Sequence, residues 1–231
     1  MIAQLASAPM VDNCLTRNEW ICGEYVRTRL PELSQALVQH VSIVIASVTL
    51  GLIIAFPLAW WSRRYPRIDA FLLGTSTAIY SIPSLALFSL LVPLIGLNVY
   101  SVIVGLGLYS LTVLVRAIGD GLGSVSPAVL ESALGVGYSP AALLFRVQLP
   151  LALPTIMAGL RVAMVSAVAL TTVGAILDAG GLGGMLLDGQ RTNFKAQVLV
   201  TSVLCVVLAV LLDLFLVLIQ RLITPWRRGL G

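Results

Sequence analysis

Residues 70–115 form a long stretch that contains no Asp, Glu, Lys or Arg. As a single helix rising 1.5 Å per residue, this stretch would extend roughly 69 Å, more than twice the ~30 Å hydrocarbon layer of a bilayer. It therefore has to turn back on itself, and Gly96-Leu97-Asn98 is the strongest turn signal inside it. The sequence thus predicts two membrane spans here, from Ala70 to Ile95 and from Tyr100 to Val115.

Three further stretches are apolar enough and long enough to cross a bilayer, namely Val41–Trp60, Leu153–Leu177 and Ala196–Arg221. The first of them can begin earlier, because Pro31 suits a first helical turn. Only 10% of the residues are charged, against roughly 25% in soluble domains. We therefore predict an all-α membrane protein of about five transmembrane helices. Residues 178–195 are expected to form a polar, glycine-rich loop before the last span.

The cations fall unevenly on the two sides of this five-span arrangement. The 62–68 loop, the 116–150 segment and the C-terminal tail share one side, which carries Arg63, Arg64, Arg67, Arg116, Arg146, Arg221, Arg227 and Arg228. The other side carries Arg17, Arg27, Arg29, Arg191 and Lys195. Because cytoplasmic loops are enriched in Lys and Arg, the first side is predicted to face the cytoplasm. The N-terminus is then outside the cell and the C-terminus inside.

Composition and spacing exclude several classes of function. Cys14, Cys22 and Cys205 lack the spacing of metal ligands, and the one histidine, His40, offers no nucleophile–base arrangement. The net charge of +4 is small and scattered, without the basic patch that nucleic-acid binding requires. We expect no catalytic residue, no metal site and no nucleic-acid partner in this chain.

Two cysteines of the N-terminal segment are candidates for a disulfide. If the N-terminus is outside, Cys14 and Cys22 lie in an oxidising space and can close a small loop. A separation of eight residues does not guarantee bridging geometry, so two free thiols remain the alternative.

Two charges, Arg161 and Asp213, lie inside the predicted spans. Each is about eight residues from the cytoplasmic end of its span, or roughly 12 Å deep. Opposite charges at equal depth predict an intramembrane ion pair, because an unpaired charge in hydrocarbon is costly. The alternative is that each side chain extends separately to the cytoplasmic interface.

The 116–150 segment is too apolar to be an idle linker. Its Ser126-Pro127 and Ser139-Pro140 pairs each place a capping hydroxyl before a proline that suits the first helical position. They predict short helices at 127–134 and 140–146, with a turn at Gly135-Val136-Gly137. The second helix would display Leu143, Leu144 and Phe145, with Arg146 at its edge. Such a helix can dock into a groove of a partner or lie on the membrane surface.

The same segment resembles a known family motif. Glu131-Ser132-Ala133, three residues, Gly137, nine residues and Val147-Gln148-Leu149-Pro150 resemble the "EAA" signature of bacterial ABC importer permeases. Ser132 and Val147 replace the alanine and isoleucine of that signature. Three further segments resemble the glycine betaine, choline and osmoprotectant branch: Ser81–Leu87, the Gly180-Gly181-Leu182-Gly183 loop and the Leu222–Pro225 end.

The resemblance implies the type I ABC importer permease fold. It implies an extracytoplasmic segment at 1–34, a transmembrane permease domain at 35–225 with a cytoplasmic coupling segment at 117–150, and a cytoplasmic tail at 226–231. In that family the signature docks on an ATPase. The residues expected to do so here are Glu131, Gly137, Ser139, Leu143, Leu144, Phe145, Arg146 and Pro150.

The resemblance also implies partners. They are two ATPase subunits, a second permease subunit (identical or paralogous), an extracytoplasmic binding protein and the lipid bilayer of the bacterial cytoplasmic (inner) membrane. The chain has no Gly-x-x-x-x-Gly-Lys-Ser/Thr loop, so ATP and Mg²⁺ would be used by another polypeptide, and the chain itself is expected not to be an enzyme and to bind no cofactor. The expected solute is an osmoprotectant such as glycine betaine, choline, carnitine or proline betaine.

Other solutes and other classes of protein are alternatives. Another small polar solute, such as an amino acid, fits the same family. A secondary transporter or channel would line its pore with ionisable residues, and a membrane-embedded hydrolase would need a buried base.

Span two carries the candidate gate of the pathway. Pro83 removes a backbone hydrogen bond and kinks the helix, while Ser81 and Ser84 can satisfy the freed carbonyls. Tyr80 beside them, like Tyr100 and Tyr109 near the spans, can contact a passing cation or serve only in packing. A gate that bends as the pathway opens and a static kink remain alternatives.

Overall fold

The computed structural model describes residues 13–63 and 65–226, and every regular element in this part of the chain is a helix. The prediction of an all-α fold is therefore confirmed. The α-helices are α1 (Gly23–Thr28), α2 (Leu30–Ser62), α3 (Pro66–Ser81), α4 (Ser84–Ile95), α5 (Val99–Gly123), α6 (Pro127–Gly135), α7 (Pro140–Leu143), α8 (Leu149–Gly174), α9 (Gly181–Arg191) and α10 (Lys195–Ile223). A π-helical turn covers Leu144–Gln148 and a 3-10 turn covers Ala175–Leu177.

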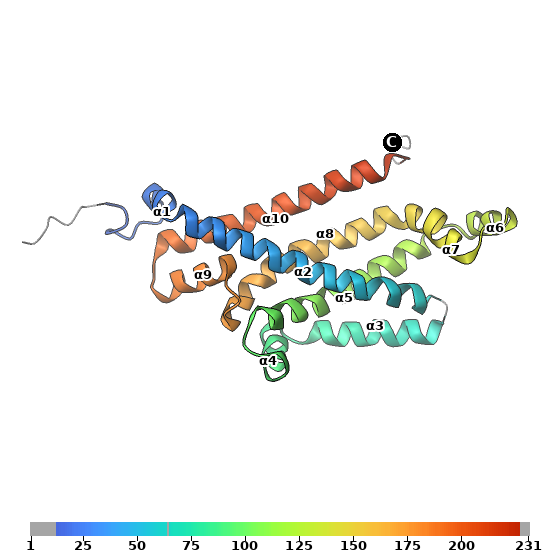
Figure 1. Cartoon of the computed structure of the whole chain (residues 1–231), viewed down its shortest axis with the longest axis horizontal. Helices are drawn as coiled ribbons and strands as arrows, with labels where there is room; N and C mark the ends of the chain where they lie inside the picture. Colours follow the sequence, from blue (N-terminus) through green and yellow to red (C-terminus); the bar gives the residue numbers. More distant parts are fainter. Residues whose placement is uncertain (1–12, 64, 227–231) are drawn as a thin grey trace, which may run out of the picture.

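The helices that run along the long axis of the molecule are α2, α3, α5, α8 and α10 (Figure 1). Helices α1 and α9 lie at one end, here called the α9 end, and α6 and α7 lie at the other, the α6 end. Helix α2 runs toward the α6 end, α3 returns, α5 runs toward it again, α8 returns, and α10 brings the chain back to the α6 end. The first and last described segments therefore lie at opposite ends, as an odd number of crossings requires.

The core lies where α2, α5 and α8 pack together. Its largest cluster joins Ala55 of α2, Leu114 and Ile118 of α5, and Ala152 of α8, all fully buried. Small residues let the helices approach closely, since a Cβ added at Gly51 of α2 would lie 2.9 Å from the Gly107 carbonyl oxygen of α5.

Span two is broken, not continuous. Helices α3 and α4 meet at an angle of 98°. Ile82 (φ −70°, ψ 128°) and Pro83 (φ −54°, ψ 136°) are extended at the break. Proline lacks the N–H of a helical residue and disfavours the helical conformation of the residue before it, so both effects act here. The prediction of one span from Ala70 to Ile95 is wrong in this respect.

The predicted loop at 178–195 is also wrong, because residues 181–191 form helix α9. Asp178, Gly180 and Gly181 have positive φ angles and turn the chain sharply before this helix starts. The turn is held by Gln39 of α2, whose Nε2 donates to the Ala179 carbonyl (3.0 Å) and whose Oε1 accepts from the Gly181 N–H (3.0 Å).

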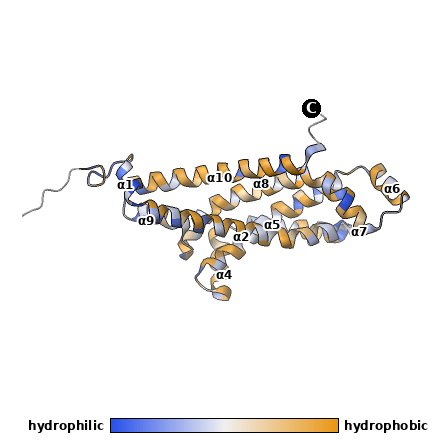
Figure 2. Ribbon diagram, turned by 45° about the horizontal axis from the view of Figure 1, so that its top comes forward, coloured by the Kyte–Doolittle hydropathy of each residue, from blue (hydrophilic) through white to orange (hydrophobic). Residues whose placement is uncertain are grey.

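Four helical segments of the described chain are long and apolar enough to cross a membrane, and the bent pair α3–α4 makes five if it counts as one span. Figure 2 shows α10 as mostly apolar along its length. Its exposed side chains include Val206, Val210, Leu214 and Leu218, which suit contact with lipid. The prediction of about five transmembrane helices is confirmed.

Candidate functional site

The segment between α5 and α8 contains the two short helices that the sequence predicts, α6 and α7. Ser139 caps α7, since its Oγ accepts the N–H of Ala142 (3.3 Å). Ser126 precedes α6 but makes no such bond with its side chain, so its predicted capping role is wrong. Between the helices Gly137 has a φ of +89°, a conformation that side chains with a Cβ rarely adopt.

The predicted helix at 140–146 does not end before span four. Helix α7 continues through the π-helical turn Leu144–Gln148 directly into α8, so that Pro140–Leu177 forms one helical rod. Pro150, in the first turn of α8, is half-buried and has no N–H to donate to the preceding turn, which is the π-helical one. A displacement of α7 must therefore be passed to α8 without an intervening loop.

The apolar surface of this segment differs from the predicted one. Leu144 is 2% exposed and belongs to the core cluster, and Leu143 is half-buried, whereas Phe145 is 58% exposed. The prediction that all three side chains are displayed together is wrong, because one turn of helix cannot present three successive residues on one face. We call the exposed apolar side chains of Leu134, Val136, Tyr138 and Phe145 the docking surface; Val129, earlier in α6, is exposed as well.

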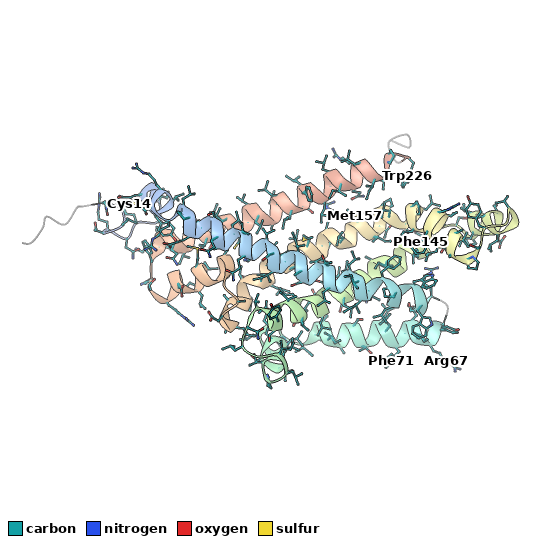
Figure 3. The ribbon with its side chains drawn as sticks, viewed as in Figure 1. Cys14, Arg67, Phe71, Phe145, Met157 and Trp226 are labelled. Carbon is teal, nitrogen blue, oxygen red and sulfur yellow. A yellow bond between two sulfur atoms is a disulfide. The ribbon has the colours of Figure 1, made fainter. Side chains whose placement is uncertain are left out.

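Polar residues of the predicted signature surround the docking surface. Glu131, Ser139 and Arg146 are all exposed. Figure 3 places Phe145 at the same end of the molecule as Arg67 and Trp226, with Cys14 at the opposite end. A cleft of about 740 Å³ beside this surface is lined by Trp60, Trp61 and Tyr65 together with Leu134 and Pro140.

The break between α3 and α4 is fixed from α5. The Tyr109 hydroxyl donates to the carbonyl of Ile82, and its ring packs edge-to-face against Tyr80 with 5.8 Å between centroids. Ser81 Oγ donates to the Thr77 carbonyl (2.9 Å). Ser84 begins α4, and its side chain has no hydrogen bond within the described residues. The carbonyl that Pro83 frees is that of Ile79, and it accepts the N–H of Ile82 (3.1 Å), so the prediction that Ser81 and Ser84 satisfy freed carbonyls is wrong.

Beside this break a groove of about 520 Å³ runs between α3, α5 and α8. Tyr80 is exposed at the break and lines it, with Thr77, Thr112 and Thr155 adding hydroxyl groups. Helices α8 and α5 approach closely where they line the groove, since a Cβ added at Gly159 of α8 would lie 2.1 Å from the Cβ of Ala117 on α5. The remaining residues that line it are Val113, Arg116, Asp120, Ala158 and Val162.

Two charged residues of the groove were missed by the sequence analysis. Helix α5 ends at Gly123, not near Val115, so Arg116 and Asp120 lie within a helix that could span the membrane. Both also line a second cavity of about 780 Å³ that opens next to the groove, with Asp69 and Arg63. The signal available in the sequence was that no proline follows Pro93 until Pro127, so nothing forces the helix to end near Val115.

Arg161 of α8 and Asp213 of α10 form an ion pair. Arg161 Nε donates to Asp213 Oδ1 and Nη2 donates to Oδ2, each over 2.7 Å. This two-bond geometry is the strong form of an arginine–carboxylate contact. The structure thus contains the predicted pair, and separate extension of the two side chains does not occur.

The N-terminal segment is closed by a disulfide between Cys14 and Cys22, with 5.5 Å between their Cα atoms. At the tip of the loop the Asn18 side chain reaches the start of α10. Its Oδ1 accepts the N–H of Lys195 (2.9 Å) and its Nδ2 donates to the Asn193 carbonyl (2.9 Å). Helix α10 has Phe194 at its own N-cap position, which makes no side-chain cap bond. Asn18 therefore caps α10 from a distant part of the sequence.

Comparison with known proteins identifies the family. Residues 47–229 match the family "Binding-protein-dependent transport system inner membrane component". The chain is 34% identical over 210 residues to the glycine betaine/carnitine/choline transport system permease protein OpuCD of Bacillus subtilis (strain 168), covering 90% of this chain and 92% of the relative. It is 33% identical over 198 residues to the osmoprotectant import permease protein OsmW of Salmonella typhimurium (strain LT2), covering 84% and 92%.

Solved structures share the fold. The methionine ABC transporter MetNI in an inward-facing conformation aligns with a TM-score of 0.75 at 20% identity, over 85% of this chain and 98% of that one. An amino acid ABC transporter solved with histidines aligns with a TM-score of 0.69 at 18% identity, over 87% and 98%. The type I ABC importer permease fold is thus confirmed.

The family is one of inner membrane components of transport systems, and these relatives are named as permease proteins. The predictions of a transport subunit that is not itself an enzyme, and of an inner-membrane location, are therefore confirmed. With its span order, its helical rod and its match over 47–229, the chain belongs to the family of binding-protein-dependent transport system inner membrane components.

Proposed function

We propose that this chain forms half of the pathway of an ATP-driven importer for osmoprotectants, such as glycine betaine, choline, carnitine or proline betaine. The observation that carries the proposal is the match to OpuCD, a permease named for glycine betaine, carnitine and choline, over nine-tenths of the chain. The groove beside Tyr80 supports it, because aromatic rings attract quaternary ammonium groups through cation–π interaction. Tyr109 and the break at Pro83 would form the wall that bends as the pathway opens.

The docking surface is proposed to contact one of two ATPase subunits, which use ATP and Mg²⁺. Four exposed apolar side chains on short helices form a compact knob suited to a groove of a partner. The rod Pro140–Leu177 would then carry movement of the ATPases to the groove, since α8 forms one of its walls. A second permease subunit would close the open side of the groove, and a binding protein would deliver the solute.

The α6 end is proposed to face the cytoplasm. Its exposed arginines include Arg63, Arg67 and Arg146, in keeping with the enrichment of cations on cytoplasmic loops. Residues 1–34 would then be extracytoplasmic, 35–225 would form the permease domain and 117–150 would be the coupling segment. Of the proposed cytoplasmic tail at 226–231, residues 227–231 lie outside the described part, as do residues 1–12.

Uptake by the complete transporter reconstituted in liposomes tests the proposal. We expect ATP-dependent uptake of labelled glycine betaine or choline, and none with a partner ATPase that cannot hydrolyse ATP. Competition by amino acids but not by quaternary ammonium compounds would favour the alternative solute class.

Crosslinking tests the docking surface separately. Phe145→Cys should crosslink to a cysteine in the ATPase groove, whereas Arg67→Cys, exposed at the same end on α3, should not. Equal crosslinking at both positions would contradict the docking surface without affecting the solute assignment.

A further inference from the structure

Arg116 and Asp120 are charged residues within α5 that have no partner in the described part of the chain. They are four residues apart, so they lie on the same face of the helix. Both are exposed, and both line the groove and the cavity next to it. A charge inside a span without a protein partner is costly in lipid and is found facing water or another polar group.

Neighbouring charges differ from these two in being engaged. Arg63 Nη1 donates to the Gly119 carbonyl (2.9 Å), and Asp69 Oδ1 accepts from Ser62 Oγ (3.0 Å). Arg161 and Asp213 neutralise each other on the far side of α8. Of the charges around the groove, Arg116 and Asp120 are therefore the ones left available to a solute.

The face that carries them also differs from the lipid-facing surface. The outer side of α10 exposes only aliphatic side chains over several turns, among them Val206 and Val210. The groove instead combines hydroxyl groups, the ring of Tyr80 and two opposite charges. This lining suits contact with water and with a small polar or charged solute.

We propose that Asp120 and Arg116 form a binding step for quaternary ammonium solutes in the groove, in which Asp120 attracts the cationic group and Arg116 the carboxylate of a zwitterion. The proposal rests on the proposed function and names the residues that would select the solute. Along α5 the two residues are separated by a rise of about 6 Å, a spacing that a short zwitterion can bridge. A solute without a carboxylate would use Asp120 alone.

The first experiment measures the groove itself and needs no transported solute. In a Cys205→Ala background, Ala158→Cys introduces an exposed thiol that lines the groove. It is reacted with methanethiosulfonates bearing either a trimethylammonium or a sulfonate group, and each rate is divided by the rate for a small thiol in solution. With Arg116→Gln added, so that Asp120 is the remaining charge of the two, we expect the trimethylammonium reagent to be favoured several-fold, because an opposite charge nearby concentrates it. Asp120→Asn should remove this preference, and Asp120→Glu should keep it.

Two controls accompany this measurement. Asp188→Asn, which removes an exposed carboxylate on α9, should leave the preference unchanged. Val206→Cys on the lipid-facing side should react with neither reagent. An unreactive Ala158→Cys, or a preference that survives Asp120→Asn, would overturn the proposal.

The second experiment compares two solutes in reconstituted transporter. Glycine betaine and choline share the trimethylammonium group, but only the former has a carboxylate. Arg116→Gln should lower uptake of glycine betaine relative to choline by about tenfold, the effect of removing one favourable charge contact in a partly solvated site. Asp120→Asn should lower both, and Arg67→Gln on α3 neither.

The outcomes separate the two proposals. If the wild-type transporter moves neither solute while the labelling preference holds, the osmoprotectant assignment fails and the cation-attracting groove stands. If both solutes are transported but Arg116→Gln lowers their uptake equally, the binding step is wrong and the assignment stands.

Discussion

Arg161 and Asp213 are joined by two parallel hydrogen bonds of 2.7 Å, which fasten α10 to α8. Replacing either residue with Ala leaves the other charged, half-buried and without a partner. We expect each single substitution to lower the free energy of unfolding, because a charge left without its partner in this setting is unfavourable.

Thermal unfolding in detergent can measure this loss, with Arg191→Ala on α9 as an exposed control. The double variant Arg161→Ala, Asp213→Ala should lose clearly less than the sum of the two single losses, since it leaves no orphaned charge. Additive losses would show that the two side chains do not stabilise each other.

Gly137 should be required for coupling between the ATPase and the pathway. Its φ of +89° disfavours any residue with a Cβ, by roughly 1–2 kcal/mol, so Gly137→Val should alter the angle between α6 and α7. We expect the variant chain to reach the membrane in normal amounts while solute uptake per ATP hydrolysed falls. Gly135→Ala is the matched control, because that glycine is helical and has nothing within 4 Å of its added Cβ. Normal coupling in Gly137→Val would contradict this role.

Asn18 should stabilise α10 through its two bonds to the start of that helix. Asn18→Ala is expected to cost about 1 kcal/mol, the usual cost of losing a helix cap. Asn193→Gly should be nearly neutral, because Asn18 contacts only the backbone carbonyl of Asn193 and glycine tolerates its φ of +55°.

Reduction of the Cys14–Cys22 disulfide should weaken the same contact, since the loop is no longer closed. Limited proteolysis near residues 192–195, with and without reductant, measures the effect of Asn18→Ala and the effect of opening the disulfide. Equal cleavage of the oxidised and reduced protein would argue against a link between the disulfide and the cap.

Tyr25 should make stability fall at high pH. Burial raises the pKa of its hydroxyl, with Arg29 opposing the rise and Glu32 adding to it. A raised pKa in the folded state means that the neutral form is favoured there. The contribution of Tyr25 to the free energy of unfolding is then fully present below the pKa of about 10 that tyrosine has in the unfolded chain. It is lost as the pH rises through the pKa of Tyr25 in the folded state.

The Tyr25 hydroxyl is also buried without a hydrogen-bond partner among residues 13–63 and 65–226. Tyr25→Phe should therefore abolish the pH dependence and raise the free energy of unfolding by up to about 1 kcal/mol at neutral pH. Urea titrations of the two proteins between pH 8 and pH 11 test this, and a parallel decline of both would refute it.

The sequence predicts the long spans well because apolar length is nearly sufficient to define a membrane helix. It does not predict what happens at Pro83, where proline indicates a kink but gives no measure of a 98° break. That angle depends on Tyr109, which lies elsewhere in the sequence and binds the Ile82 carbonyl.

Two further differences between the prediction and the structure arise where tertiary contacts override a local signal in the sequence. The glycines at 180–184 resemble a loop, but Gln39 fixes their turn so that a helix can follow. Leu144 belongs to an apolar triplet whose burial is decided by the packing of α7 against the core. For Arg116 and Asp120, charge alone suggested the end of a span, whereas the structure places them on a groove wall.

The π-helical turn at Leu144–Gln148 sets how α7 is rotated about the helix axis relative to α8. A π turn contains one residue more than an α-helical turn, and one residue of α-helix corresponds to a rotation of about 100°. The number of residues in this turn and its π-helical form therefore together set the direction in which Pro140 and Leu143 project relative to α8. A chain lacking one residue of this turn could close it as an ordinary α-helical turn and keep its knob aimed as it is now, whereas the loss of one residue elsewhere between α7 and α8 would turn the knob by about 100°.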